Sequence, residues 1–317
     1  MSATLKIFEK FDEEVKRLWN SFEGVIENPF LDYEINKNWF EIFGKNSKLK
    51  IFTDNKNFIA PMHFNKNVAY FCGGQDLFDY HDLISNDRAN KDTIKQLFDE
   101  ILSKISLIEL NSIAEGSKIH KLVRVLEKEY NIEYIDEDVC PMINLPNTFE
   151  NYLKMLSKKN RHELRRKIRK FENNLDFKII ESDSNNAQEH INEFFRLMKF
   201  NFEKRNFLNK NRIEFMSRII KHSILFNKGN LSFIKIGNEM VAASFSFKNK
   251  EKLYVYNSGF NDNYSEYSVG LLNHIYNIKN KISEYKFIDF LRGSEEYKYR
   301  IGCVNQDLIT IKIMNKS

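Results

Sequence analysis

At 317 residues the chain is too long for one ordinary domain and has the length of two. Hydrophobic residues make up 42% and charged residues 29%, and glycine and proline are scarce, which excludes a disordered or fibrous protein. The net charge of +5 is too small for a protein that coats nucleic acid with a uniformly basic surface.

The first half of the chain begins with helices and continues through a meander of strands. Apolar residues at helical spacing predict helices over 10–22, 39–43, 91–104 and 118–129. Short runs rich in β-branched and aromatic residues predict strands over 49–52, 58–63, 68–71, 106–110, 132–135 and 142–145. Pro146 follows the last of these strands and marks the expected domain boundary.

The second half repeats this order of elements. Helices are predicted over 148–172, 188–205, 212–226 and 269–282. Strands are predicted over 175–180, 231–236, 240–248, 253–258, 286–291 and 307–314. We therefore expect an α/β protein with mixed sheets of the α+β kind. It would consist of two architectural repeats, residues 1–147 and 148–317, that share no sequence identity.

Several classes of site and location are excluded by residue placement. Cys72, Cys140 and Cys303 lie far apart and outside any zinc motif, so we expect no metal site and a reducing compartment. The first residues carry no signal-peptide core, and no apolar run approaches the ~20 residues of a membrane span. These observations predict a cytoplasmic protein without a membrane span.

The positive charge is concentrated in one predicted helix. Residues 151–178 carry ten basic and three acidic groups. Lys158, Arg161, Arg165 and Arg169 are spaced by three and four residues and so share one face of that helix. One interpretation is that this face binds a phosphate-rich ligand, which would be a nucleotide-linked acceptor or RNA. The other is that it is a solvated network of ion pairs. The sequence leaves both interpretations open.

An ordered set of segments resembles the BioF2-like/CelD-like acetyltransferase family of the GNAT superfamily, which is related to the Fem peptidyltransferases. The matching segments are 140–146, the basic helix from 151, 258–260 with 267–272, and 287–293 with 297–300. The sequence departs from the family at Val269, where the family often has proline. The resemblance implies two tandem GNAT-like domains, with the acyl-donor site in the C-terminal domain and none in the N-terminal one.

The resemblance also implies acyl-CoA, such as acetyl-CoA, as a co-substrate, with no tightly bound cofactor. The residues that it assigns to donor binding are Ser258, Gly259, Phe260, Ser268, Gly270 and Leu271. The local sequence agrees with this assignment, because Gly270 stands at the start of a predicted helix. A helix N-terminus offers free N–H groups to phosphate oxygens, and a glycine there permits close approach of the ligand.

By the same resemblance, an amine attacks the acyl thioester directly, without a protein nucleophile. The candidate catalytic residues are Asp289 and Tyr297, and the candidate acceptor-binding residues are Lys158, Arg161, Arg165, Arg292 and Lys298. Strand alternation places Asp289 on an apolar face with Phe287 and Leu291, where a carboxylate needs a partner. It is therefore either the base that takes the amine's proton or one half of a buried ion pair.

Three functions remain open from the sequence. The first is N-acyl transfer to a small amine acceptor. The family suggests that this acceptor is an amino sugar or another cell-envelope precursor, and the basic helix would bind a phosphate group on it. The second is a Fem-like transferase that takes its donor from tRNA, gripped by that helix. The third is an inactive GNAT fold that acts as a binding module, which stays open because Ser265 and Ser268 depart from the superfamily's phosphate-binding loop.

Overall fold

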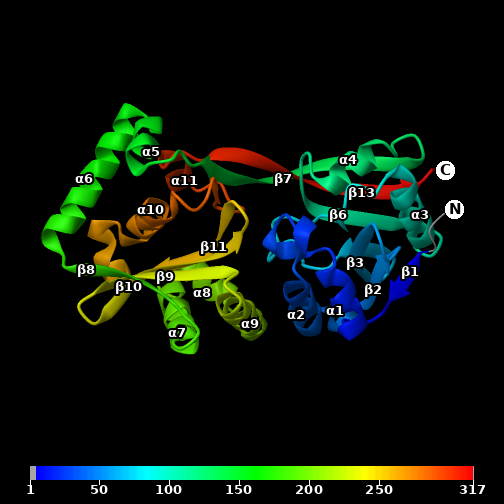
Figure 1. Cartoon of the computed structure of the whole chain (residues 1–317), viewed down its shortest axis with the longest axis horizontal. Coiled ribbons are helices and arrows are strands. Elements are labelled where there is room, and N and C mark those ends of the chain that lie inside the picture. Colours follow the sequence, from blue (N-terminus) through cyan, green and yellow to red (C-terminus); the bar gives the residue numbers. More distant parts are fainter. Residues whose placement is uncertain (1–4, 317) are drawn as a thin grey trace. The chain divides into compact units, whose positions relative to one another are not determined.

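The computed structural model describes residues 5–316, which form two compact units (Figure 1). Unit 1 contains the described residues up to Val139 and those from Gln306 onward, and unit 2 contains Cys140–Asn305. This division differs from the predicted boundary at 147/148, and the last strand belongs to unit 1 rather than to unit 2. The reason is that the C-terminal strand pairs with a strand of unit 1, a long-range crossover that no local sequence pattern reveals.

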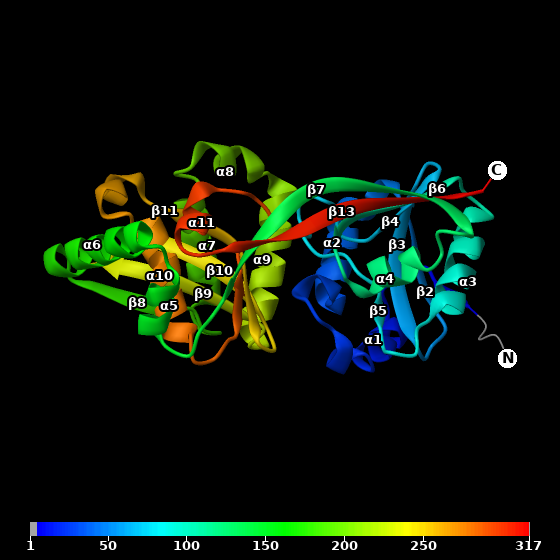
Figure 2. The ribbon, with the colours of Figure 1, turned by 90° about the horizontal axis from the view of Figure 1, so that it is seen from above.

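Unit 1 is a mixed sheet with helices packed against it. Its strands follow the order β1 (Lys6–Phe8), β2 (Lys48–Thr53), β3 (Phe58–Asn65), β4 (Val68–Phe71), β6 (Leu107–Ala114), β13 (Val304–Asn315) and β7 (Tyr130–Asn144), with β5 (Ile84–Ser85) beside β3. The helices of this unit are α1 (Glu13–Asn20), α2 (Tyr33–Phe43), α3 (Lys91–Leu102) and α4 (Lys118–Arg124). The long strands β7 and β13 run side by side (Figures 1 and 2).

Unit 2 starts from the end of β7 and contains the second sheet. After β7 the order is β12 (Phe287–Asp289), β11 (Lys252–Phe260), β10 (Glu239–Asn249), β9 (Gly229–Ile236) and β8 (Phe177–Glu181). The helices are α5 (Phe149–Met155), α6 (Lys158–Asn174), α7 (Ala187–Met198), α8 (Phe202–Phe207), α9 (Lys210–Leu225), α10 (Val269–Lys281) and α11 (Glu296–Arg300). The strands β11 and β12 are parallel, whereas the other pairs in this unit are antiparallel.

Helices cover both faces of the sheet in unit 2 (Figure 1). Helix α10 packs on one face, where Ile275 and Ile278 join Leu253, Ile288 and other buried residues in one apolar cluster. Helices α7 and α9 pack on the opposite face. The core therefore holds α10 and β11 in fixed positions, and these two elements carry the candidate site.

The predicted α/β class with mixed sheets is confirmed, and most predicted elements are present with shifted ends. Two long predicted helices are each broken in two. The segment 148–172 breaks at Ser157, whose hydroxyl caps α6 by accepting from the Asn160 N–H at 3.3 Å. The segment 188–205 separates into α7 and α8, where Asn201 caps the second helix.

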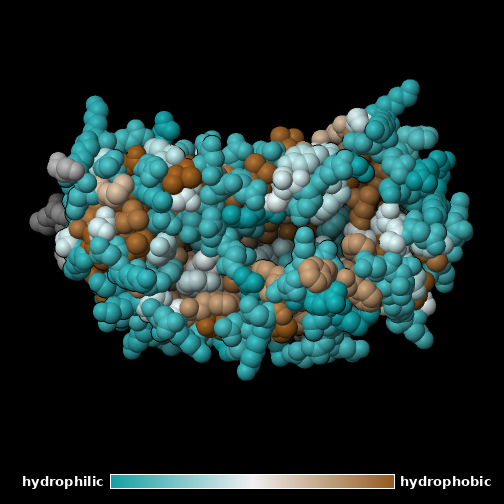
Figure 3. Space-filling view, turned by 180° about the vertical axis from the view of Figure 1, so that it is seen from behind, coloured by the Kyte–Doolittle hydropathy of each residue, from teal (hydrophilic) through white to brown (hydrophobic). Residues whose placement is uncertain are grey.

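The surface of the chain is mostly hydrophilic on the face that Figure 3 shows. Among residues 5–316, no helix has both the length and the apolar character that a bilayer span requires.

Candidate donor site in unit 2

The strands β11 and β12 pair over a short stretch and then diverge. Their parallel register joins Lys252 to Phe287 and Tyr254 to Asp289, where β12 ends. Strand β11 continues to Phe260 beside β10, and its register against β10 shifts between Phe245 and Ser246. Beyond Tyr254, the edge of β11 that faced β12 is therefore released.

The hydrogen-bonding pattern shows which backbone groups face this released edge. The Asn261 N–H donates to the Val241 carbonyl of β10 at 2.8 Å. Because antiparallel ladders alternate, the backbone groups of Phe260 and Ser258 point away from β10, toward the released edge. The ammonium of Lys204, a residue of α8, donates to the Ser258 carbonyl at 2.6 Å and confirms this direction. An extended chain that contains amides could pair with such an edge.

The two predicted site glycines are explained first by close packing. A side chain on Gly259 would collide with the backbone of Met198 at the end of α7. A Cβ on Gly270 would lie 2.6 Å from the ring of Phe260, which is 36% exposed. Gly270 therefore allows Phe260 to lie against the start of α10, and the two predicted residues are brought together.

The N-terminus of α10 presents free N–H groups. Ser268 precedes the helix with a left-handed φ of 57°, and its hydroxyl accepts from Lys167 Nζ at 2.6 Å instead of capping the helix. The first N–H groups of a helix have no intrahelical acceptor, so those of Gly270 and Leu271 are available to a ligand. Lys167 adds a positive charge from α6. Together, the ammonium and the helix dipole make this position favourable for a phosphate group.

The basic helix also contacts the loop before α10 at a second point. Lys170 Nζ lies 3.1 Å from the carboxylate of Glu266 and 3.1 Å from its carbonyl oxygen. The sequence left open whether α6 binds an anion or carries a solvated network of ion pairs. The structure brings Lys167 to the donor loop, whereas the predicted Lys158, Arg161 and Arg165 lie elsewhere on the helix.

Asp289 and Lys298 both hold the turn that follows β12. The fully buried carboxylate of Asp289 accepts from the Leu291 N–H at 2.8 Å and lies 3.9 Å from Lys252 Nζ. Lys298 is 2% exposed, and its ammonium donates to the carbonyl oxygens of residues 291, 292 and 293 at 3.3, 3.0 and 2.9 Å. These contacts fix the backbone of the predicted Arg292 opposite the released edge of β11.

Tyr297 lies in an aromatic group beside this turn. Its ring stacks on His274 of α10, with centroids 5.7 Å apart and planes 7° apart, and meets Phe290 edge-on. Burial raises the pKa of Tyr297, so the phenol stays protonated and can donate a hydrogen bond but not accept a proton. Burial, with Lys204 and Lys298 nearby, lowers the pKa of His274 to about 3, so its imidazole is neutral.

The sequence alone did not select Lys204, His274 or Glu295. These three residues lie around the released edge of β11 and the turn that follows β12. Lys204 is half-buried, and burial lowers its pKa to about 8, an effect that Glu295 opposes and Lys298 reinforces. No spacing signal could have found Lys204, because α8 is a short helix and its lysine is one of many. His274 lies next to the apolar face of α10, and this position in the sequence indicates a structural role.

The predicted acceptor residues on α6 are only partly brought together. Lys158 lines a cavity of about 840 Å³ with Lys159, Asn160, His162, Glu163, Glu296 and Arg300. Arg161 donates to the Lys154 carbonyl at 3.3 Å, and Arg165 forms an exposed ion pair with Glu150 at 3.0 Å. Arg300 of α11 thus lies beside Lys158 at this cavity, where it pairs with Glu296 at 2.6 Å, as Arg165 pairs with Glu150.

The corresponding position in unit 1 is filled by its own chain. There β4 and β6 pair in parallel between Val68 and Leu107 and between Ala69 and Ile108. Beyond this point, the His81 N–H donates to the Ser112 carbonyl at 3.0 Å, and His81 Nδ1 lies 2.9 Å from the Asn111 carbonyl oxygen. At the following helix α3, the side chain of Asn90 caps the N-terminus.

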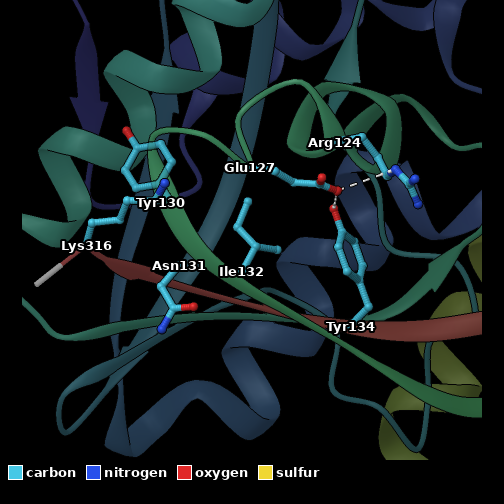
Figure 4. A pocket seen from close by; sticks show the side chains of 7 residues that line it. All are labelled: Arg124, Glu127, Tyr130, Asn131, Ile132, Tyr134 and Lys316. Carbon is cyan, nitrogen blue, oxygen red and sulfur yellow. Dashed lines mark hydrogen bonds and ion pairs between the residues drawn. The ribbon is translucent and has the colours of Figure 1, made fainter.

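Unit 1 also carries a surface pocket that holds none of the predicted site residues (Figure 4). It is lined by Arg124, Glu127, Tyr130, Asn131, Ile132, Tyr134 and Lys316. Glu127 accepts from the Tyr134 hydroxyl at 2.9 Å and lies 3.5 Å from Arg124, so its charge is already compensated. In the part of the chain that the structure describes, no three His, Cys, Asp or Glu side chains gather as metal ligands would.

Comparison with known proteins identifies the fold of both units. Residues 158–299 match the acetyltransferase (GNAT) domain family. No curated protein shows significant sequence similarity to the chain.

Several solved structures are similar over nearly the whole chain. The L-PGS from Bacillus licheniformis superposes with a TM-score of 0.64 at 12% identity, over 98% of this chain and 95% of that one. FemX gives 0.63 at 10% identity over 96% of each chain. A tandem GNAT protein from the clavulanic acid biosynthesis pathway gives 0.52 at 6% identity over 98% of each chain. The chain thus has the predicted fold of two tandem GNAT-like domains.

Proposed function

This chain belongs to the GNAT superfamily, with Fem-like relatives in fold, and on that premise we propose that unit 2 transfers an acyl group from acyl-CoA to an amine. One observation carries the proposal: the released edge of β11 leads to an N-terminus of α10 that Ser268 leaves uncapped. Coenzyme A joins a diphosphate to an extended arm with two amides. The helix N-terminus with Lys167 suits the diphosphate, and the edge at Phe260 suits the amides.

The difference between the two units supports this choice of site. In unit 1 the same strand divergence is occupied by His81, and α3 is capped by Asn90. We therefore propose that unit 1 binds no donor and that each chain binds one acyl-CoA. Since acyl-CoA is a cytoplasmic metabolite, the proposal includes a cytoplasmic location.

For the acceptor, we propose a small phosphorylated amine, in the class of amino sugars and other cell-envelope precursors. The cavity lined by Lys158, Lys159 and Arg300, together with Glu163 and Glu296, is the feature that supports it. Cations from two helices, α6 and α11, line this cavity. Arginine and lysine side chains form strong charge-assisted hydrogen bonds with phosphate oxygens.

A second candidate is a Fem-like transferase that takes an aminoacyl group from tRNA. The observation that favours it is the exposed basic surface of α5 and α6, which includes Lys154 of α5 and Lys159 and Arg169 of α6. Binding to tRNA through such a surface would weaken steeply as salt rises. A third candidate, an inactive binding module, would bind neither donor.

Calorimetric titration with acetyl-CoA tests the proposal, using wild type, Lys167→Met and the control Lys178→Met, an exposed lysine on β8. We expect one site per wild-type chain and a loss of about tenfold in affinity for Lys167→Met, the value of one charge-assisted contact. The control should bind like wild type. Absence of acetyl-CoA binding together with salt-dependent binding of tRNA would replace the proposal with the Fem-like function.

A further inference from the structure

Lys204 lies against the released edge of β11, at Ser258. Its ammonium is held on the Ser258 carbonyl at 2.6 Å and lies 3.4 Å from the Ser258 hydroxyl. We propose that Lys204 is the general base of unit 2, the group that takes the proton from the incoming ammonium of the acceptor. This inference rests on the proposed function, because it assumes a donor bound along β11.

The position follows from the direction of β11. A diphosphate at the start of α10 lies near Phe260, since Gly270 and Phe260 are in contact. The arm of the donor then runs back along the released edge toward Ser258, two residues and roughly 7 Å further. The end of the arm therefore arrives at Lys204, opposite the turn that Lys298 and Asp289 hold in place.

The surroundings of Lys204 support a neutral amine. Glu295 and Lys298 face it from the start of α11, and the neutral His274 faces it from α10. Burial is the main cause that lowers the pKa of Lys204 to about 8, so near neutral pH a useful fraction is unprotonated. Lys204 also remains partly exposed, so the amine can reach a substrate.

The other titratable groups of the centre are less suited to this role. Asp289 is fully buried and accepts the Leu291 N–H, and the carboxylate of Glu295 lies 2.9 Å from the ammonium of Lys298. With a pKa of about 3, His274 is too weak a base for an ammonium group. The Tyr297 phenol stays protonated because burial raises its pKa.

The proposed chemistry balances without another reactant. The neutral amine of Lys204 takes one proton from the acceptor ammonium. The freed amine then attacks the thioester carbonyl carbon, so a C–N bond forms and the C–S bond breaks. The remaining extra proton on the new amide nitrogen goes to the departing thiolate, and Lys204 returns its proton to solvent.

The same geometry makes Lys204 open to acylation when no acceptor is present. Its neutral nitrogen would attack the thioester carbonyl of bound acetyl-CoA, form the amide bond and release coenzyme A, with the nitrogen's proton passing to the thiolate. This side reaction provides a test that needs no knowledge of the acceptor.

Competitive labelling with acetic anhydride, read by peptide mass spectrometry from pH 6 to 11, measures the titration of single lysines. We expect a midpoint near pH 8 for Lys204 and at least tenfold faster labelling at pH 7 than for Lys210, an exposed residue at the start of α9. Coenzyme A should protect Lys204 at least fivefold and leave Lys210 unprotected. A midpoint above pH 10, or equal labelling of Lys204 with and without coenzyme A, would overturn the proposal.

Incubation with acetyl-CoA alone completes the test. We expect Lys204 to be acetylated more than tenfold faster than Lys210, at a rate that rises as the pH passes through 8. Acetylation of Lys204 no faster than that of Lys210 would overturn the proposal. Lys204→Arg, which keeps a donor for the Ser258 carbonyl but cannot lose its proton near neutral pH, should bind acetyl-CoA like wild type. If wild type binds no acetyl-CoA, the proposed function fails and the role of Lys204 fails with it.

Discussion

Lys167 and Ser268 are 101 residues apart in the chain, yet the Lys167 ammonium donates to the Ser268 hydroxyl at 2.6 Å. This contact joins the basic helix α6 to the start of α10. It also withdraws the serine hydroxyl from the usual capping role, so the first N–H groups of α10 stay available. A single side-chain contact therefore supplies both a positive charge and free donors to the same place.

The contact between Gly270 and Phe260 leads to a first prediction. We expect Gly270→Ala to weaken acetyl-CoA binding by about tenfold, because its Cβ would lie 2.6 Å from the Phe260 ring and push that ring across the released edge. Phe260 is partly exposed and can move, so the melting temperature should change little. The double variant Gly270→Ala with Phe260→Ala removes the collision and should regain part of the affinity. Calorimetric titration decides, and unchanged affinity in Gly270→Ala would remove this contact from the site.

A second prediction concerns the number of donor sites. Wild type should bind one acetyl-CoA per chain, because His81 occupies the strand divergence of unit 1. His81→Ala should lower stability by roughly 1 to 3 kcal/mol, since it removes a buried side chain and its hydrogen bond, and should leave the donor stoichiometry at one. Titration of both proteins with acetyl-CoA measures this number, and two sites in wild type would contradict the proposal.

The fold could be predicted from sequence because the elements of each unit carry strong local signals. The apolar periodicity of α10 and the β-branched runs of β9 to β11 gave these elements nearly complete. The domain boundary could not be predicted, because the pairing of Ile311 with Leu110 joins residues that are 201 positions apart in the sequence. Local patterns contain no information about such a crossover.

The site was only partly predictable for a similar reason. The position of Ser268 and Gly270 at the start of a helix could be predicted, and a glycine there lets a ligand approach free backbone N–H groups closely. Lys204 could not, because its importance arises from the carbonyl of Ser258, 54 residues away, and from burial that no periodicity indicates. Asp289 was identified as a buried carboxylate, but its hydrogen bond to the Leu291 N–H lies in a turn, where Leu291 has a left-handed φ of 53°, and no periodic pattern indicates it.

The third prediction separates anchoring from catalysis at Asp289. Asp289→Asn keeps an acceptor for the Leu291 N–H but removes the charge that lies 3.9 Å from Lys252. We expect unfolding free energy to fall by about 1 to 3 kcal/mol, within the range for a disturbed buried polar group. The rate of Lys204 acetylation by acetyl-CoA, measured on folded protein, should stay within about threefold of wild type. An unchanged stability with a rate at least a hundredfold lower would instead identify Asp289 as the base.

The last prediction concerns His274 and the pH dependence of stability. Burial, with Lys204 and Lys298 nearby, holds the pKa of His274 at about 3 in the folded chain, below the ordinary value near 6.5. The unfolded chain therefore binds a proton that the folded chain excludes, so His274 favours folding fully above pH 6.5 and progressively less as the pH falls toward 3. The effect should amount to roughly 3 to 5 kcal/mol across this interval.

His274→Phe, which keeps an aromatic ring against Tyr297, should unfold with a shallower dependence on pH than wild type. Urea unfolding at several pH values between 7 and 4 measures the difference, with His162→Phe at an exposed position as the control. Parallel pH profiles for wild type and His274→Phe would show that the pKa of His274 is the same in the folded and unfolded chains, which would contradict the lowered pKa of this imidazole.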